Sequence, residues 1–157
     1  MRKETEIIFV DVHAETTSEK IAMGRFLDGK VSAVIGTHTH VQTADDRILP
    51  GGTAFLCDAG MCGPSESILG RDIESIVARF LTNLPVQFPI ARGPVRMQGA
   101  LMEIDEGSGR ATAMERFNQE FVPRGQASAG PTRTATAQLP TTPDASREPG
   151  VGPEKAP

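Results

Sequence analysis

The sequence predicts an α/β protein, and three observations lead to that class. The segments at 6–11 and 31–35 contain apolar runs rich in β-branched side chains, a composition typical of buried strands. Residues 16–29, between them, carry apolar side chains at helical spacing. A strand, a helix and a strand within about 30 residues form a βαβ unit, with parallel strands and a right-handed crossover.

The first strand and the first helix have recognisable ends. The apolar run at 7–10 is continuous, so the strand at 6–11 is expected to be buried on both faces. Thr16 is followed three residues later by Glu19, which matches the capping box of a helix N-terminus. Gly29 stands where a helix commonly ends on a glycine.

The later elements are a strand, a helix and a hairpin. Residues 53–57 form a third apolar strand. Asp72 is a suitable N-cap for a helix with apolar residues at positions i, i+3, i+4, i+7 and i+8. Residues 99–105 and 111–119 are expected to pair across a turn at 106–109. The apolar face of the helix consists of Ile73, Ile76, Val77, Phe80 and Leu81.

Length and composition limit the class of protein. The 157 residues fit one domain, and a net charge of −4 gives no sign of a DNA-binding surface. No apolar run reaches the roughly 18 residues of a membrane span, so we expect a cytoplasmic protein. The two cysteines are not expected to form a disulfide framework there. Residues 123–157 are rich in Pro, Gly, Ser, Thr and Ala and are expected to be a disordered tail after a folded unit of residues 1–122.

All three histidines follow the end of a predicted strand. His13 follows the first strand, and His38 and His40 lie in Gly36-Thr37-His38-Thr39-His40 after the second. Ligand and catalytic groups of α/β proteins gather at the carboxyl ends of strands. Adjacent strands lie about 4.8 Å apart, so the three imidazoles are expected within a few ångströms of one another. Imidazole nitrogen suits zinc, iron, manganese, nickel or copper, and three histidines alone resemble a single catalytic zinc site with one open position.

Other polar residues near the histidines have two interpretations each. Lys20 can reach a phosphate, but a solvated lysine in the first turn of a helix is favoured. Cys57 and Cys62 can supply soft ligands, but their spacing is not that of a CxxC knuckle, so two idle thiols are favoured. Local hydrogen bonding in a turn is favoured for Thr37 and Thr39. The carboxylates that can ligate a metal or orient a histidine are Asp11, Glu15, Asp45 and Asp58.

Three segments together resemble the YmdB-like metallophosphoesterases of bacteria, in the calcineurin-like superfamily. They are residues 11–20 (DVHAETTSEK), 36–45 (GTHTHVQTAD) and 58–64 (DAGMCGP), within a resemblance that covers about residues 1–120. The resemblance implies a four-layer αββα sandwich. It also implies two metal ions, iron or manganese, and hydrolysis of phosphodiesters such as 2′,3′-cyclic nucleotides. On this resemblance His13 and His38 look like ligands of one metal and His40 like a ligand of the other, with no residue assigned as catalytic.

The sequence also departs from the family pattern. Family members begin with a strand that carries a metal-binding Asp, followed by a bridging Glu with an Asn and then by an Asn-His pair. Those motifs are not found in this sequence. The chain is therefore expected to be the C-terminal half of the sandwich, a partial metallophosphoesterase domain. Half a sandwich leaves strand edges and an apolar face uncovered, so a homo-oligomer or the missing N-terminal half is the expected protein partner.

Three functions follow from these residues. The first is a metal-dependent phosphodiesterase that acts on a small phosphodiester or nucleotide and is inactive or incomplete in this chain alone. The second is a non-catalytic fragment or binding module that keeps a weak three-histidine metal site. The third is a single-zinc hydrolase that uses His13, His38 and His40 with a water, and the family resemblance argues against it.

Overall fold

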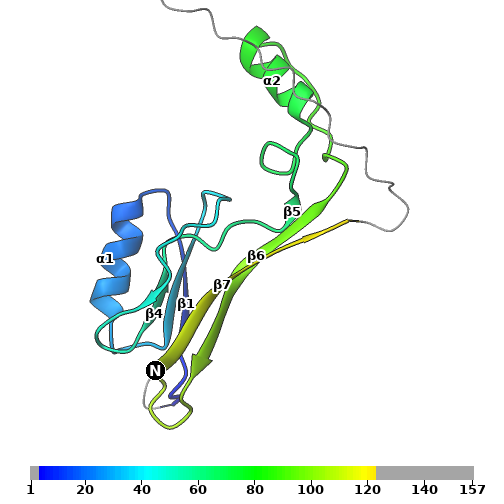
Figure 1. Cartoon of the computed structure of the whole chain (residues 1–157). Helices are drawn as coiled ribbons and strands as arrows, with labels where there is room; N and C mark the ends of the chain where they lie inside the picture. The colour runs from blue at the N-terminus through cyan, green and yellow to red at the C-terminus, as the bar shows by residue number, and fades with distance from the viewer. Residues whose placement is uncertain (1–3, 123–157) are drawn as a thin grey trace, which may run out of the picture.

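The computed structural model describes residues 4–122, and helices and strands alternate along its first half (Figure 1). The predicted tail at 123–157 lies outside the described residues. The elements are β1 (Phe9–His13), α1 (Thr17–Leu27), β2 (Ala33–Thr37), β3 (Arg47–Ile48), β4 (Ala54–Leu56), β5 (Gly63–Pro64), α2 (Ile73–Thr82), β6 (Val95–Ile104) and β7 (Ala111–Phe121).

The predicted βαβ unit is confirmed. Strands β1 and β2 are parallel neighbours, joined by α1, and their register places His13 beside Thr37. Strand β4 extends the sheet in parallel on the other side of β2, and the short β3 closes it antiparallel, in the order β1-β2-β4-β3. The carboxyl ends of β1, β2 and β4 therefore meet at one edge of this sheet.

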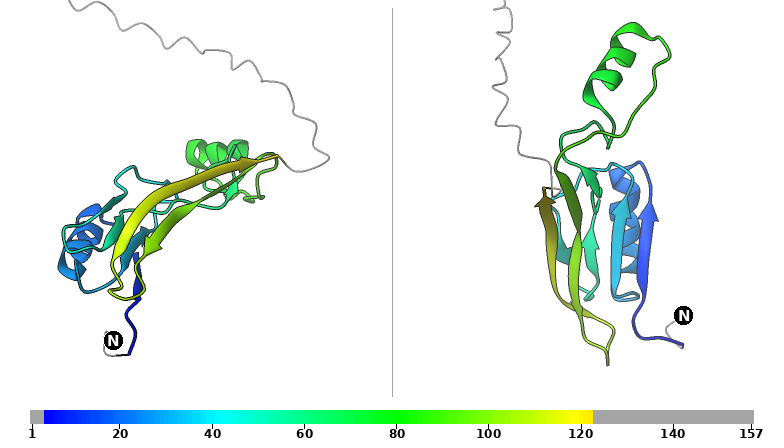
Figure 2. Two further views of the ribbon diagram at one scale, coloured as in Figure 1. Left: turned by 60° about the horizontal axis from the view of Figure 1, so that its bottom comes forward. Right: turned by 90° about the vertical axis from the view of Figure 1, so that its right-hand side faces the viewer.

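The second sheet consists of the predicted hairpin and one short strand. Strands β6 and β7 pair antiparallel across the turn at 106–109, and β5 pairs with the outer part of β6. Helix α1 covers one face of the four-stranded sheet and the hairpin covers the other (Figure 2). The fold is thus mixed α/β with two sheets and one flanking helix in the described part.

The two faces of the four-stranded sheet carry different side chains. Toward α1, Val34 and Phe55 are buried together with Ile8, Val31, Leu49 and Cys57. Gly24 of α1 allows a close approach there, because a Cβ at that position would lie 2.4 Å from the Phe55 ring. Toward the hairpin the contact uses small residues, which lets the two sheets approach closely. The residues of that second cluster are Ala33, Ala54 and Ala111, with Met102 and Met114 packed against them.

The prediction that the first strand is buried on both faces is wrong. Strand β1 begins at Phe9 and has only β2 as a neighbour, so it lies at the edge of the sheet. Its side chains alternate between exposed and half-buried, and Phe9 is 56% exposed. The half-buried Val10 and Val12 pack on the α1 side, while the hairpin does not cover the opposite side of this strand. An apolar run predicts burial only where a second layer reaches the strand.

Both predicted helices form, but their ends and faces differ from expectation. Thr16 is the N-cap of α1, yet its hydroxyl donates to the Glu19 carboxylate (2.6 Å) and makes no hydrogen bond to the helix backbone. Asp72 does cap α2, since its Oδ1 accepts from the backbone N–H of Ser75 (2.9 Å). Helix α2 stands away from the two sheets (Figure 1), and Phe80 on its apolar face is 80% exposed.

Within residues 4–122, no helix is long and apolar enough to cross a membrane.

Candidate metal centre

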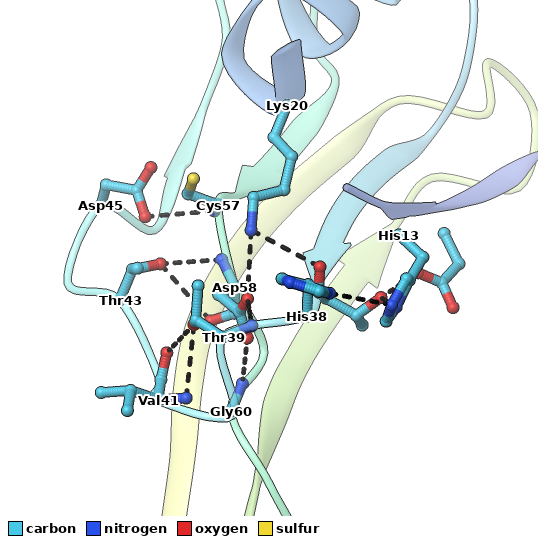
Figure 3. A network of polar contacts seen from close by, with 12 residues as sticks. His13, Lys20, His38, Thr39, Val41, Thr43, Asp45, Cys57, Asp58 and Gly60 are labelled. Atoms are coloured by element: carbon cyan, nitrogen blue, oxygen red, sulfur yellow. Dashed lines mark hydrogen bonds and ion pairs between the residues drawn. The ribbon is translucent and has the colours of Figure 1, made fainter. Parts of the chain in front are cut away.

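Two of the three histidines meet at the carboxyl edge of the four-stranded sheet. His13 is the last residue of β1, and His38 directly follows the end of the neighbouring β2. The parallel register brings their rings together: His13 Nε2 lies 3.1 Å from His38 Nδ1, and the rings meet edge to face with centroids 5.0 Å apart (Figure 3). Both side chains are exposed. The prediction that strand-end histidines come together is met for this pair.

A chain of hydrogen bonds determines the tautomer of His13. The Thr37 hydroxyl donates to Asp11 Oδ1 (2.9 Å), and the same oxygen lies 3.0 Å from His13 Nδ1. Because the hydroxyl proton is already directed at Asp11, the hydroxyl oxygen must accept from His13 Nδ1–H. His13 Nε2 is then unprotonated in the neutral ring, and its lone pair is directed toward His38. Thr37 therefore orients a histidine and does not serve only as a turn residue.

This arrangement gives a prediction for Thr37→Val, which keeps the side-chain shape and removes the hydroxyl. His13 Nδ1 loses its acceptor, so we expect ¹⁵N NMR of the histidine rings to change from one His13 tautomer to a mixture. The variant should lose no more than about 1 kcal/mol of unfolding free energy, the usual contribution of one hydrogen bond. Thr39→Val is the matched control, because the Thr39 hydroxyl donates locally to the Val41 carbonyl (3.1 Å). A single His13 tautomer in both variants would refute the assignment.

The nitrogen pair fits a shared metal ion. Two imidazole nitrogens that each lie about 2.1 Å from one ion and at roughly right angles are about 3 Å apart, close to the observed separation. His40 lies two residues beyond His38 and lines a separate small cavity of about 140 Å³ with Met61, Arg96 and Gln98. Residues 4–122 contain no group of three or more His, Cys, Asp or Glu side chains placed to hold an ion. The described chain thus brings His13 and His38 together but does not by itself assemble the expected three-histidine cluster.

The loop that carries His38 and His40 has an unusual backbone. His38 has φ 134° and His40 has φ 63°, both in the region that favours glycine. Such conformations cost about 1–3 kcal/mol each and persist only where surrounding contacts hold them. The segment at 38–40 therefore depends on the groups that surround it.

Lys20 is one of those groups, and the expectation that it is solvated is wrong. Its side chain is 1% exposed, and Nζ lies 3.1 Å from Asp58 Oδ2, whose side chain is 0% exposed. Lys20 lies on the face of α1 that packs on the sheet, and the absence of a side chain at Gly36 makes room for it. A Cβ there would lie 2.7 Å from Lys20 Cδ. The sequence pattern placed Lys20 in the first turn of the helix. It could not show that Lys20 pairs with a carboxylate, because Asp58 is 38 residues away in sequence.

Asp58 connects the loops that follow β2 and β4. Its Oδ2 accepts from the backbone N–H of Thr39 (2.8 Å), and its Oδ1 accepts from that of Gly60 (3.0 Å). Burial by itself raises the pKa of the Asp58 carboxyl. The hydrogen bonds from Thr39, Gly60 and Lys20 outweigh burial, so the pKa lies below the usual value.

The lowered pKa of Asp58 predicts a stability loss in acid. A carboxyl whose pKa is lower in the folded than in the unfolded state stabilises the fold above its unfolded pKa, about 3.9, and loses that contribution as the pH falls through the folded value. We expect the wild type and a Lys20→Met/Asp58→Asn variant to differ in unfolding free energy by a constant amount from pH 7 to 5. Below about pH 4 the difference should shift against the wild type. Urea unfolding over this pH range measures it, and a constant difference down to pH 2.5 would contradict it.

The other residues singled out in the sequence have structural contacts. Asp45 Oδ1 accepts from the backbone N–H of Cys57 (3.1 Å), and burial raises the pKa of the Cys57 thiol. Both cysteines are free: Cys57 is buried, and the exposed Cys62 donates its thiol to the Gln98 carbonyl (3.5 Å). Glu15 is exposed at the surface.

Sequence reasoning missed Gln42. Its Nε2 donates to the carbonyls of Gly99 on β6 (2.8 Å) and Phe117 on β7 (3.1 Å), and it lies 3.4 Å from the Ala59 carbonyl. One amide therefore joins the loop after β2 to both strands of the hairpin. One indication in the sequence that Gln42 matters is its place inside the segment at 36–45. No local pattern could indicate its hydrogen bonds to carbonyls that are so far away in sequence.

Comparison with known proteins identifies the family. The family model described as "YmdB-like protein" matches residues 1–117. The chain belongs to the YmdB-like family. A relative from Bacillus subtilis (strain 168), named 2′,3′-cyclic-nucleotide 2′-phosphodiesterase, is 55% identical over 115 residues. A Mycoplasma pneumoniae relative, named as a candidate phosphatase/phosphodiesterase, is 36% identical over 116 residues.

Two solved structures have a fold similar to that of this YmdB-like chain. A hypothetical protein from Thermus thermophilus matches with a TM-score of 0.68 at 43% identity, over 73% of this chain and 45% of that one. A phosphatase from Mycoplasma pneumoniae matches with a TM-score of 0.69 at 36% identity, over 73% of this chain and 41% of that one. The resemblance to the family is confirmed, and the family includes proteins named as phosphoester hydrolases.

The match covers only part of the YmdB-like relatives. The aligned region is 73% of this chain but 44% of the Bacillus subtilis protein and 41% of the Mycoplasma pneumoniae protein. The chain thus spans less than half the length of these curated relatives.

Proposed function

We propose that this chain contributes one part of the metal centre of a phosphodiesterase, with His13, His38 and His40 as metal ligands. The observation that carries the proposal is the His13–His38 nitrogen pair at 3.1 Å, in which Thr37 orients the His13 ring. The proposed metals are two ions, iron or manganese, and the proposed substrate is a small phosphodiester such as a 2′,3′-cyclic nucleotide. The name of the Bacillus subtilis relative supports that substrate class.

The residues of this chain bind and orient in the proposed reaction. Two bound metal ions lower the pKa of water and stabilise charge on phosphoryl oxygens. His13 presents Nε2 as a ligand because its Nδ1 keeps the proton and donates it in a hydrogen bond to the Thr37 hydroxyl. His38 would present Nδ1, which in this structure donates to His13 Nε2, from the loop that Asp58 contacts. His40 follows two residues later in the same loop and would supply its ring to the second ion. We assign no residue of this chain as the general acid that protonates the leaving oxygen.

We further propose that the site is incomplete in this chain alone. Two facts support this: the described residues hold no group of three ligands, and the match covers less than half of the curated relatives. Residues 1–122 would then be a partial metallophosphoesterase domain within a four-layer sandwich, whose other ligands belong to the unmatched part of the family's chain. The cytoplasm is the compartment expected for this enzyme.

Metal binding and turnover test the proposal. We expect the purified chain to bind Mn²⁺ weakly in isothermal titration calorimetry, and His13→Ala and His38→Ala each to abolish binding. Glu106→Gln, an exposed carboxylate in the hairpin turn, is the matched control and should bind as the wild type does. Hydrolysis of 2′,3′-cyclic AMP by the chain with Mn²⁺ should be at background. Addition of the unmatched portion of the Bacillus subtilis relative should produce turnover that requires His38.

Two results would overturn this account. Clear turnover by the chain alone would show that the site is complete. Equal Mn²⁺ binding by the wild type and the two histidine variants would remove the metal site itself. A second candidate, a non-catalytic module with a weak metal site, is favoured by the lack of a third clustered ligand among the described residues. It predicts Mn²⁺ binding that depends on His13 and His38, with no turnover even when the unmatched portion is supplied.

A further inference from the structure

We propose that the buried Lys20–Asp58 pair positions the histidine loop at residues 37–40 for metal binding. The inference rests on the proposed function, because it assigns a role toward the same metal ligands. Lys20 and Asp58 act on the backbone of that loop rather than on a bound ion, so both are positioning residues.

The geometry is specific to the loop between the two histidines. Asp58 Oδ2 accepts from Thr39 N–H at 2.8 Å and from Lys20 Nζ at 3.1 Å (Figure 3). Thr39 stands between His38 and His40, and its N–H belongs to the peptide that follows His38, so this hydrogen bond holds that peptide. Lys20 Nζ also lies 3.5 Å from the Thr37 carbonyl, at the start of the same loop. The pair therefore contacts the backbone on both sides of His38.

The loop needs such contacts because two of its residues have backbone conformations that are unfavourable by themselves. His38 and His40 both have positive φ, and the Thr39 hydroxyl donates to the Val41 carbonyl (3.1 Å) and accepts from the Val41 N–H (3.4 Å). A non-glycine residue at positive φ returns to the common regions unless neighbouring groups prevent it. The Asp58 carboxylate, whose side chain is 0% exposed, supplies the constraint from inside the protein.

The pair is itself held in place independently of the histidines. The Asp58 backbone N–H donates to the Thr43 hydroxyl (2.9 Å), and the Asp58 carbonyl accepts from the Thr43 N–H (3.1 Å). The Lys20 side chain comes from α1 and passes through the space left by Gly36. The loop is thereby tied to the helix layer and to the end of β4 at once. A substitution of the two charges can consequently change the loop while the Asp58 backbone stays in place.

The test compares two variants of the full chain. Lys20→Met/Asp58→Asn removes both charges together, so no unpaired charge stays buried. Thr53→Val is the matched control: Thr53 is fully buried and its hydroxyl links Gly29 N–H (2.9 Å) and the Val31 carbonyl (2.7 Å) at the far end of the sheet. The first readout is the NMR contact between the His13 and His38 rings in the absence of metal. The second is the affinity for Mn²⁺.

We expect the double variant to lose the His13–His38 ring contact and to bind Mn²⁺ about 10- to 100-fold more weakly, the usual effect of losing a partner that orients metal ligands. The control should keep the ring contact and the wild-type affinity, even if it unfolds more easily. If the methionine variant does not fold, Lys20→Met/Asp58→Leu replaces it: it also removes both charges, leaves no acceptor for the Thr39 N–H, and should give the same two losses.

The outcomes separate this inference from the proposed function. A double variant that keeps the ring contact and binds Mn²⁺ like the wild type overturns the positioning role. If the wild type shows no Mn²⁺ binding, the proposed function fails. The positioning role is then tested by one comparison, the NMR contact between the His13 and His38 rings in the wild type and in the double variant. Equal losses in Thr53→Val would show a general effect of stability and would also overturn it.

Discussion

Replacing Lys20 by methionine should lower the free energy of unfolding by about 3–5 kcal/mol, the usual cost of breaking a buried ion pair by removal of one partner. Methionine keeps most of the volume of the lysine side chain, so little of this loss comes from packing. The cost arises because the Asp58 carboxylate, whose side chain is 0% exposed, is left without its counter-ion. Urea denaturation at pH 7, followed by circular dichroism, measures the change.

The neutral double variant is the control for this prediction. Lys20→Met/Asp58→Asn removes the carboxylate as well, so it should unfold less easily than Lys20→Met alone. The comparison separates the cost of an uncompensated charge from the contribution of the pair, which is often small. A single variant at least as stable as the double variant would show that the pair is not buried as described.

Replacing Gly36 by alanine should also be strongly destabilising. A Cβ at this position would lie 1.8 Å from the Cys57 carbonyl oxygen, which belongs to the backbone and cannot rotate away. Strand β2 would have to move from the segment that follows β4, and the hydrogen bond from Ala59 N–H to the Gly36 carbonyl (2.9 Å) would be lost. We expect a loss of at least about 2 kcal/mol in unfolding free energy, as for other overpacked sites.

Gly99→Ala provides the matched control for Gly36→Ala. Gly99 also lies within a strand, β6, and a Cβ there would have nothing within 4 Å. Its substitution should change the unfolding free energy by no more than about 0.5 kcal/mol. Equal stability of the two alanine variants would contradict the close approach of β2 and the loop at Gly36.

Local sequence patterns predicted the elements well because they depend on near neighbours. The alternation of β-branched runs and helical spacing predicted β1, α1 and β2, and the glycine-containing turn at 106–109 predicted the β6–β7 hairpin. Such patterns indicate only which side chains of one segment share an apolar face. They could not show that β1 is an edge strand, because that depends on where the hairpin lies in space.

The candidate site also has a part that the sequence predicted and a part that it could not predict. The meeting of His13 and His38 was predictable because each follows a strand end and parallel strands end at one edge. The residues that hold them were not, because their partners are distant in sequence: Lys20 pairs with Asp58, and Gln42 bonds the carbonyls of Gly99 and Phe117. A lysine in the first turn of a helix has the same local signature whether it faces water or a carboxylate.

The Gln42 amide has a mechanical consequence. It spans from the loop that carries His38 and His40 to both strands of the hairpin, whose outer part leads toward α2 (Figure 1). A hinge between the two sheets at this level would have to break these hydrogen bonds before it could bend. The position of the hairpin relative to the backbone beside the proposed metal ligands is therefore restrained by the hydrogen bonds of a single side chain.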